Sequence, residues 1–161
     1  DVNGDYYAPG FPSAYYMADD AKITLLSDFE VSFISAEANL LLNNDVDAKT
    51  SMETAITQNF VELGLDAATD AAPYIAANAD WSTATDKHGL IMFQKYLANY
   101  LQPESYNDWR RTGYPNLTAN AGSASGQIPR RYIYPTNEIQ NNPNASNASG
   151  GLYTTRVWWD R

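Results

Sequence analysis

The sequence contains no cysteine and only one histidine, His88, among its 161 residues. A disulfide, a thiolate nucleophile and a cysteine-ligated zinc site are therefore excluded, as is any site that needs two histidines. No segment approaches the roughly 20 apolar residues of a membrane span. Residues 1–5 lack the basic flank and apolar run of a signal peptide, so we expect a chain that is cytoplasmic, already processed or cut from a longer protein.

Basic residues are also scarce, with ten Lys and Arg against 19 Asp and Glu and a formal net charge of −9. This balance argues against a nucleic-acid binder and against electrostatic attachment to anionic lipid. The acidic residues gather in residues 1–80, which hold 14 carboxylates and two lysines, whereas residues 81–161 hold five carboxylates and eight basic residues. Two interpretations stay open: solvated acidic helices with arginines that fasten a loop-rich tail, or a dipolar molecule that docks against a partner.

Helical periodicity begins after a Tyr-, Gly- and Pro-rich first segment. Ser27 or Asp28 is expected to cap the first helix, and residues 43–45 to end it. Apolar residues spaced by three, four and three predict the face that packs into the core. This predicted face consists of Val31, Ile34, Ala38 and Leu41.

A second helix is predicted from about Asp47, with Gly64 as its left-handed C-terminal cap. The short link between the two helices predicts an antiparallel hairpin. The apolar face of this second helix consists of Met52, Ile56, Phe60 and Leu63.

Three further helical segments are predicted, over residues 66–79 with Pro73 in a first turn, from Thr85 or Asp86 to about 101, and over 104–111. No helix is expected after Tyr114, where a long coil rich in Pro, Gly and Asn follows. The predicted helices indicate an all-α fold, and the similar lengths of the hairpins 31–63 and 70–101 match stacked two-helix repeats, although the two hairpins show no residue-by-residue self-similarity. The apolar face of the helix before residue 101 consists of Leu90, Phe93, Leu97 and Leu101.

Residue patterns for catalysis or metal binding are weak. Asp1, Asn3 and Asp5 resemble the start of a calcium loop, but Tyr6 and Pro12 stand where that loop needs glycine and an acid. His88 has no suitably placed carboxylate nearby in the sequence, and neither a nucleophile elbow nor a phosphate-binding glycine loop occurs. We therefore expect no catalytic residue, metal or cofactor; a glycosidase with two carboxylates meeting in space is a distant alternative.

Aromatic residues are abundant, at 13% of the chain, and several cluster in the first loop. Tyrosine and tryptophan on loops can stack on sugar faces or line a peptide groove, because each ring has an apolar body and a polar tip. The alternative is that these rings cover the helical body. The candidate ligand-binding residues are Tyr6, Tyr7, Tyr15, Tyr16 and Trp81.

The C-terminal third contains three long motifs, at residues 107–115 (NDWRRTGYP), 128–138 (IPRRYIYPTNE) and 154–160 (TTRVWWD). Together with FISAEA at 33–38 and QKYL at 94–97, these motifs resemble the SusD/RagB family of surface nutrient-binding lipoproteins of Bacteroidetes. The resemblance runs from about residue 22 to the end of the chain, in the expected order.

The resemblance implies an outer-membrane, surface-exposed lipoprotein of polysaccharide utilisation with a tetratricopeptide-like body. Such a protein caps a SusC-like TonB-dependent transporter, binds glycan or in some members peptide, and is not an enzyme. Members are several times longer and begin with a signal peptide and a lipidated cysteine. We therefore expect residues 1–161 to form a single helical domain, the C-terminal part of a longer protein without the anchor.

The motif residues are expected to be structural. Arg110 and Arg111 can bind backbone carbonyls or a carboxylate such as Glu37, and Trp158 and Trp159 are expected to seal the helical body. Two alternatives remain: a helical scaffold without a small ligand, and a fragment that forms a homodimer through an exposed apolar patch. The complete motif set is Glu37, Trp109, Arg110, Arg111, Arg130, Arg131, Trp158 and Trp159.

Overall fold

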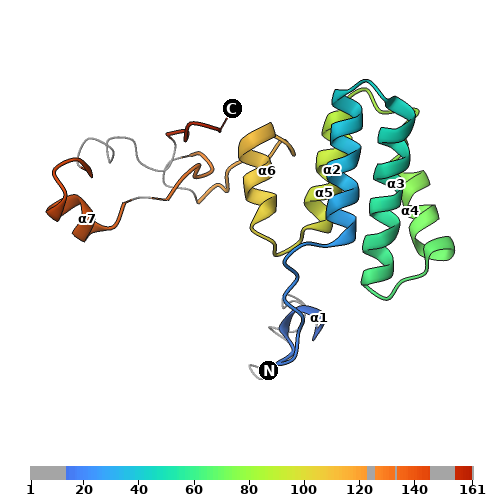
Figure 1. Ribbon diagram of the computed structural model, residues 1–161, viewed down its shortest axis with the longest axis horizontal. Helices are drawn as coiled ribbons and strands as arrows, with labels where there is room; N and C mark the ends of the chain where they lie inside the picture. Colours follow the sequence, from blue (N-terminus) through green and yellow to red (C-terminus); the bar gives the residue numbers. More distant parts are fainter. Residues whose placement is uncertain (1–13, 123–125, 133, 146–154, 161) are drawn as a thin grey trace. The chain divides into compact units, whose positions relative to one another are not determined.

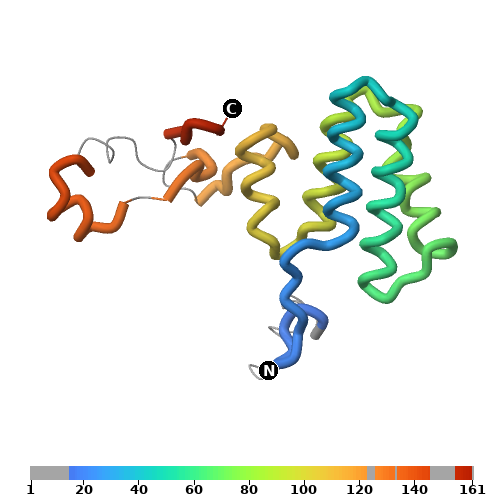
Figure 2. Tube along the Cα trace, viewed as in Figure 1, coloured from blue at the N-terminus to red at the C-terminus, as the bar shows by residue number. Residues whose placement is uncertain are grey.

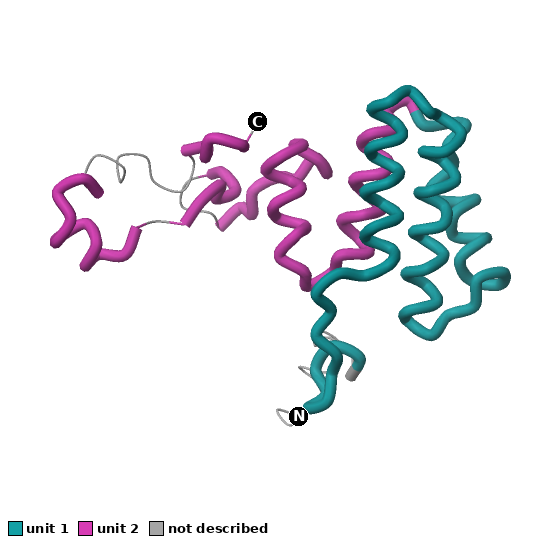
Figure 3. The backbone as a smooth tube through the Cα atoms, viewed as in Figure 1, with its two compact units in different colours: residues 1–84 teal, residues 85–161 magenta. Residues whose placement is uncertain are grey.

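The computed structural model describes residues 14–122, 126–132, 134–145 and 155–160. The chain divides into two compact units, unit 1 over residues 1–84 and unit 2 over 85–161, and each is described by itself (Figure 3). The described residues form helices and contain no strand, which confirms the all-α prediction. The tetratricopeptide-like detail and the single-domain expectation stay predictions.

Unit 1 begins with the short helix α1 (Ala14–Met17), followed by α2 (Asp28–Leu41) and α3 (Asp45–Glu62). The Ser27 hydroxyl accepts the backbone N–H of Glu30 at 3.1 Å, so of the two predicted candidates, Ser27 and Asp28, Ser27 is the N-cap of α2. Gly64 has a φ of 80°, which confirms its predicted left-handed position just after α3.

Helices α2 and α3 form the predicted antiparallel hairpin and lie side by side in unit 1 (Figure 1). Two side-chain hydrogen bonds join them: the Ser32 hydroxyl donates to Gln58 Oε1 at 2.7 Å, and the Ser35 and Ser51 hydroxyls lie 3.3 Å apart. Small side chains permit this close approach. The fully buried residues of the hairpin include Phe33, Ala36, Ala48, Met52 and Ala55.

The predicted core face of α2 is wrong. Val31, Ile34 and Leu41 are 50%, 49% and 69% exposed, and Ala38 is exposed too. The buried side of α2 consists of Phe29, Phe33, Ala36 and Glu37. The helix carries apolar residues on more than one side, and periodicity alone does not decide which side the neighbouring helix covers.

Two short helical segments complete unit 1, the π-helix η2 (Ala67–Ala71) and α4 (Ala72–Asn78). Asp66 caps η2 by accepting the N–H groups of Ala68 and Thr69, both at 2.8 Å. Pro73 occupies the first turn of α4, as predicted. Figure 2 follows the chain from α3 through η2 into α4, and both segments contact α3.

Unit 2 contains α5 (Lys87–Ala98), α6 (Glu104–Thr112) and α7 (Thr136–Asn141). Asp86 caps α5, and Gly113, with a φ of 79°, ends α6. The helix α7 corrects the expectation that no helix follows Tyr114. This helix has six residues, too few to show apolar periodicity in the sequence. A side-chain hydrogen bond from the Asn142 amide to Glu138 stabilises its end.

The predicted apolar face of α5 is also wrong, because Phe93, Leu97 and Leu101 are exposed. The buried residues of α5 include Ile91 and Lys95 instead. Lys95 is buried because its Nζ lies 2.6 Å from Asp108 Oδ2 of α6, an ion pair that joins the two helices. Because lysine is not an apolar residue, the spacing of apolar residues alone does not predict this buried side of α5.

Met52→Ala is expected to destabilise the protein by about 2–5 kcal/mol, because Met52 is fully buried in the α2–α3 hairpin and alanine leaves a cavity. Urea denaturation followed by circular dichroism measures the change. Val46→Ala, at a position 76% exposed, is the control and should alter the free energy of unfolding by less than about 0.5 kcal/mol. Equal effects of the two substitutions would contradict the packing described here.

Candidate functional site

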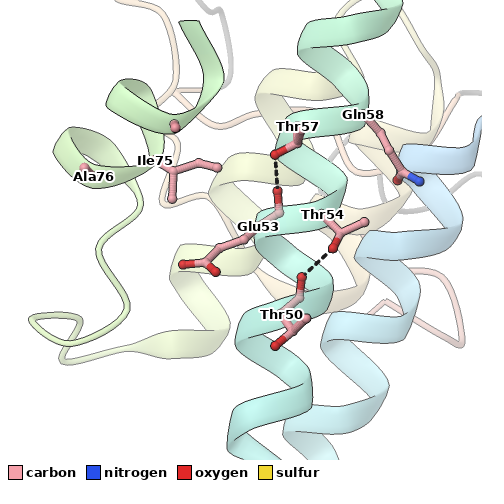
Figure 4. Close-up of a pocket in the computed structure, with 8 residues that line it drawn as sticks. Thr50, Glu53, Thr54, Thr57, Gln58, Ile75 and Ala76 are labelled. Carbon is pink, nitrogen blue, oxygen red and sulfur yellow. Dashed lines mark hydrogen bonds between the residues drawn. The ribbon is translucent and has the colours of Figure 1, made fainter. Parts of the chain in front are cut away.

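A groove of about 560 Å³ lies between α3 and the η2–α4 segment of unit 1 (Figure 4). Figure 4 shows Ile75 of α4 pointing toward α3, whose Glu53 and Thr57 side chains lie on the facing side. The full lining consists of Thr50, Glu53, Thr54, Thr57, Gln58, Ala72, Ile75 and Ala76. The groove therefore combines an aliphatic side from α4 with a polar side from α3.

The threonine hydroxyls of the groove donate their hydrogen bonds to backbone carbonyls within α3. The hydroxyls of Thr50, Thr54 and Thr57 donate to the carbonyls four residues earlier at 2.8–2.9 Å. Each hydroxyl oxygen then keeps lone pairs that can accept a hydrogen bond. Glu53 adds a carboxylate that is half-exposed and lies 3.6 Å from Lys49 Nζ. The α3 wall is thus rich in acceptors for a ligand that carries hydroxyl groups.

Each of the two helices that line the groove also carries an aromatic residue close in sequence to a lining residue. Phe60 stands three residues after Thr57 on α3, and Tyr74 precedes Ile75 on α4. Their ring centroids are 5.1 Å apart with a tilt of 46°, and both rings are half-buried. Rings of this kind offer an apolar surface that packs against the C–H faces of a ligand.

The predicted ligand residues Tyr15 and Tyr16 form an edge-to-face pair with centroids 4.8 Å apart. The Tyr15 hydroxyl donates to Glu62 Oε1 at 2.9 Å, which ties α1 to the end of α3. Partial burial and this hydrogen bond raise the pKa of Tyr15 to about 12, so its hydroxyl stays protonated at neutral pH. Tyr15 remains partly exposed, whereas Tyr6 and Tyr7 lie outside the described residues.

The expectation of an exposed ring at Trp81 is wrong, because Trp81 is only 7% exposed. Its indole N–H donates to Asp45 Oδ2 at 3.1 Å, at the start of α3. The preceding Asp80 closes a tight turn by accepting from Ser82 and Thr83. A partner 36 residues away in the sequence leaves no local signal, so the polar loop suggested exposure instead.

The C-terminal motifs form a stacked cluster in unit 2. The guanidinium of Arg130 lies 4.4 Å from the ring centroid of Trp109 and binds both carboxylate oxygens of Asp160. Arg110 lies 4.4 Å from the Trp159 ring and donates to the Arg130 carbonyl at 3.1 Å. Arginine serves this arrangement because its planar fork stacks on rings and binds a carboxylate with two nitrogens.

The expected binding of backbone carbonyls by an arginine is confirmed, since Arg110 and Arg130 each donate to the carbonyl of the other. The carboxylate that Arg130 binds is Asp160. Glu37, the carboxylate suggested from the sequence, is buried on α2 in unit 1. Arg111 binds Asp108 at 2.8 Å.

The outermost motif residues differ in their surroundings. Arg131 donates to the carbonyl of Tyr132 at 3.4 Å and lies 5.3 Å from the Tyr134 ring. The expectation that both terminal tryptophans pack is wrong for Trp158, which is 95% exposed. Both tryptophans lie in the turn that the Asp160 N–H closes on the Val157 carbonyl, and of the two Trp159 stacks on Arg110.

His88 belongs to a small polar cluster at the start of α5. Its ring lies edge-on to Tyr114, with centroids 5.4 Å apart, and the Tyr114 hydroxyl donates to Asp86 Oδ2. That bond and the N–H of Gly89 lower the pKa of Asp86, and the same bond raises the pKa of Tyr114. These contacts account for Asp86 as a helix cap.

The described residues hold no group of three or more His, Asp or Glu side chains that could bind a metal ion. The calcium-loop candidates Asp1, Asn3 and Asp5 lie outside the described residues. Within the described part of the chain, no helix combines the length and apolar character needed to cross a membrane.

Residues 7–135, most of the chain, match the family model SusD-like_2, described as starch-binding associating with outer membrane. No curated protein and no solved structure matches the chain. The matched region includes α2 to α6, the groove, the motif at 107–115 and residues 128–135 of the second motif, whereas the motif at 154–160 lies outside it.

Arg130→Lys is expected to destabilise unit 2 by about 1–3 kcal/mol, because lysine cannot bind both oxygens of buried Asp160 while stacking on Trp109. Urea denaturation followed by tryptophan fluorescence measures this loss. Arg131→Lys is the matched control, and the single long hydrogen bond of Arg131 predicts a change within about 0.5 kcal/mol. If Arg131→Lys were as unstable as Arg130→Lys, the contacts of Arg130 with Asp160 and Trp109 would not be what stabilises unit 2.

Tyr114→Phe is expected to raise the pKa of Asp86 toward its ordinary value, because the largest cause of its depression is the Tyr114 hydrogen bond. A carboxylate with a lowered pKa in the folded state stabilises the fold above its unfolded pKa of about 3.9, and this stabilisation is lost as the pH falls through the folded value. The variant should therefore lose less stability between neutral pH and pH about 3. Carboxyl NMR titration measures the pKa, with Asp66, which is held by N–H groups of its own turn, as the unchanged reference.

Proposed function

The chain belongs to the SusD-like family, and from this premise we propose a cell-surface binding protein that holds a neutral glycan for uptake through a TonB-dependent outer-membrane transporter. Family membership implies carbohydrate binding in association with the outer membrane. The cell-surface position, the transporter partner and the role as part of a longer lipoprotein are the finer steps of the proposal. The family is described by binding, so we propose no catalytic role.

The groove between α3 and α4 supports glycan binding, and it is the observation that carries the proposal. A sugar presents hydroxyl groups around an apolar C–H face, so its site needs acceptors, donors and an apolar surface together. Glu53 and the threonine oxygens accept, the Gln58 amide can donate, and Ile75 supplies the aliphatic side. The groove volume of about 560 Å³ suits a short oligosaccharide.

The tyrosine pair at the start of the described chain supports an extended site. Tyr15 is fixed to Glu62 at the end of α3, and its hydroxyl remains protonated well above neutral pH. A protonated phenol can both donate and accept, as a sugar hydroxyl requires. We propose Tyr15 and Tyr16 as a second contact for longer chains, together with Tyr6 and Tyr7. Trp81 contributes indirectly, by holding Asp45 at the start of α3.

The charge of unit 1 favours a neutral ligand. Residues 1–80 carry 14 carboxylates and two lysines, and one of these lysines is beside Glu53 in an ion pair. An acidic sugar would therefore meet a negative potential at the groove. Neutral glucans and other uncharged oligosaccharides avoid this repulsion. A peptide is the second candidate, favoured by the partly aliphatic groove wall at Ile75 and Ala76.

Glu53→Ala is expected to weaken the binding of a neutral malto-oligosaccharide by about tenfold or more, because the variant removes the charged acceptor of the groove. Isothermal titration calorimetry on the full chain measures the association constant. Asp47→Ala removes a carboxylate from the same helix outside the groove and is the matched control, which should bind as the wild type does.

A second pair of variants tests the tyrosine contact. Tyr15→Ala should weaken binding of long oligosaccharides about two- to tenfold and leave short ones unaffected. Tyr100→Ala, another exposed tyrosine, is its control. Binding of short peptides in place of every neutral sugar tested would replace the glycan proposal by the peptide one, and unchanged glycan binding in Glu53→Ala would move the site out of the groove.

A further inference from the structure

The outer face of α2 is an apolar surface that the described residues of unit 1 leave exposed. Val31, Ile34, Ala38 and Leu41 follow each other at helical spacing, so their side chains adjoin along one stripe. The three larger residues keep about half to two thirds of their surface exposed. We call these four residues the α2 stripe. Contiguous exposed apolar surface of this kind is rare on soluble proteins and commonly marks an interaction site.

The stripe is not the remnant of a poorly formed core. The opposite side of α2 is buried through Phe29, Phe33 and Ala36. The same helix therefore has one apolar side that the fold uses and another that it leaves exposed. Leu42, just after α2, and Val46, in the first turn of α3, are 70% and 76% exposed and continue the run of exposed aliphatic residues along the chain.

One exposed carboxylate precedes the stripe on α2, and another follows it in the sequence at the start of α3. Asp28 lies in the first turn of α2, before Val31, and Asp47 lies in the first turn of α3, after Leu41. Both are exposed. Residues 1–84 contain no arginine and only two lysines, Lys22 and Lys49, and Lys49 is paired with Glu53. The apolar stripe is thus bordered by negative charge, which selects the charge of whatever binds to it.

This charge pattern argues against a second copy of the chain as the occupant. In an antiparallel pair of α2 helices, Asp28 of one copy would approach Asp47 of the other, and in a parallel pair like residues would meet. Either arrangement places like charges together beside an apolar contact, which disfavours association.

We propose that the α2 stripe is a docking surface for an amphipathic helix of a partner protein that carries Lys or Arg at both ends of its apolar face. The 14 residues of α2 span about 20 Å, so the basic residues of the partner are separated by about three to four turns. An apolar face at positions i, i+3, i+7 and i+10 matches the spacing of the stripe. This docking surface is distinct from the glycan groove on α3 and α4 and does not depend on the proposed ligand.

The probe is a labelled 18-residue amphipathic peptide with a Leu and Ala face and two lysines at each end, titrated with the full chain by fluorescence anisotropy. A second peptide has glutamates in place of the lysines. The lysine peptide should bind in the micromolar range and at least about tenfold more tightly than the glutamate peptide, with an affinity that falls as salt is added.

Variants place the contact on α2. Val31→Ser and Ile34→Ser should each weaken binding of the lysine peptide about tenfold and leave the circular dichroism spectrum unchanged, since both side chains are half-exposed. Val61→Ser, at a valine on α3 that is 55% exposed, is the matched control and should bind normally.

Three results would overturn the proposal. They are equal binding of the lysine and glutamate peptides, no binding of the lysine peptide at concentrations up to about 1 mM, and equal weakening in Val31→Ser and Val61→Ser. Analytical ultracentrifugation adds a fourth, because a wild-type dimer that Ile34→Ser dissociates would make the second copy the occupant.

Discussion

The packing of α2 against α3 is the constraint on which the rest of unit 1 depends. Serine hydroxyls bridge the two helices and fully buried alanines on both permit a close approach, so the pairing consumes one specific side of each helix. What remains of α3 faces α4 and becomes the polar wall of the groove. What remains of α2 becomes the exposed apolar stripe. The candidate ligand site and the candidate docking surface are thus both consequences of which faces this one contact uses.

Unit 2 follows a different principle, because its coil is fastened by stacked arginines rather than by an apolar core. Asp160 is buried, so its charge has to be compensated, and Arg130 does this while stacking on Trp109. The demand for a planar, always charged partner explains why these positions are arginine and tryptophan rather than lysine and leucine. The sequence motifs are therefore recognisable because they encode a geometry that few residue types can satisfy, and they are structural for the same reason.

Local signals were enough to narrow the N-terminal caps to two neighbouring residues each, of which Ser27 and Asp86 are the caps, and to predict the left-handed Gly64, the hairpin link and the first-turn position of Pro73. The buried faces of α2 and α5 were not predictable in this way. On α2 two apolar sides compete, and on α5 the buried face contains a lysine whose partner, Asp108, lies on another helix. The burial of Trp81 was not predictable for the same reason, because its hydrogen-bond partner Asp45 is distant in the sequence. The groove could not be foreseen either, because its walls come from α3 and α4 and their threonines show no pattern that distinguishes a lining residue from a solvated one.

The uneven charge of the chain is best interpreted together with the positions of its exposed apolar surfaces. In unit 1 the carboxylate of Asp28 precedes the α2 stripe, that of Asp47 follows it in the first turn of α3, and that of Glu53 lines the groove. The same negative potential then acts on both surfaces: in the two proposals it disfavours acidic sugars at one and acidic helices or a second copy at the other. Charge that contributes little to the stability of the fold can in this way determine which molecules the fold accepts, and a neutral glycan together with a basic partner helix is the combination that satisfies both surfaces at once.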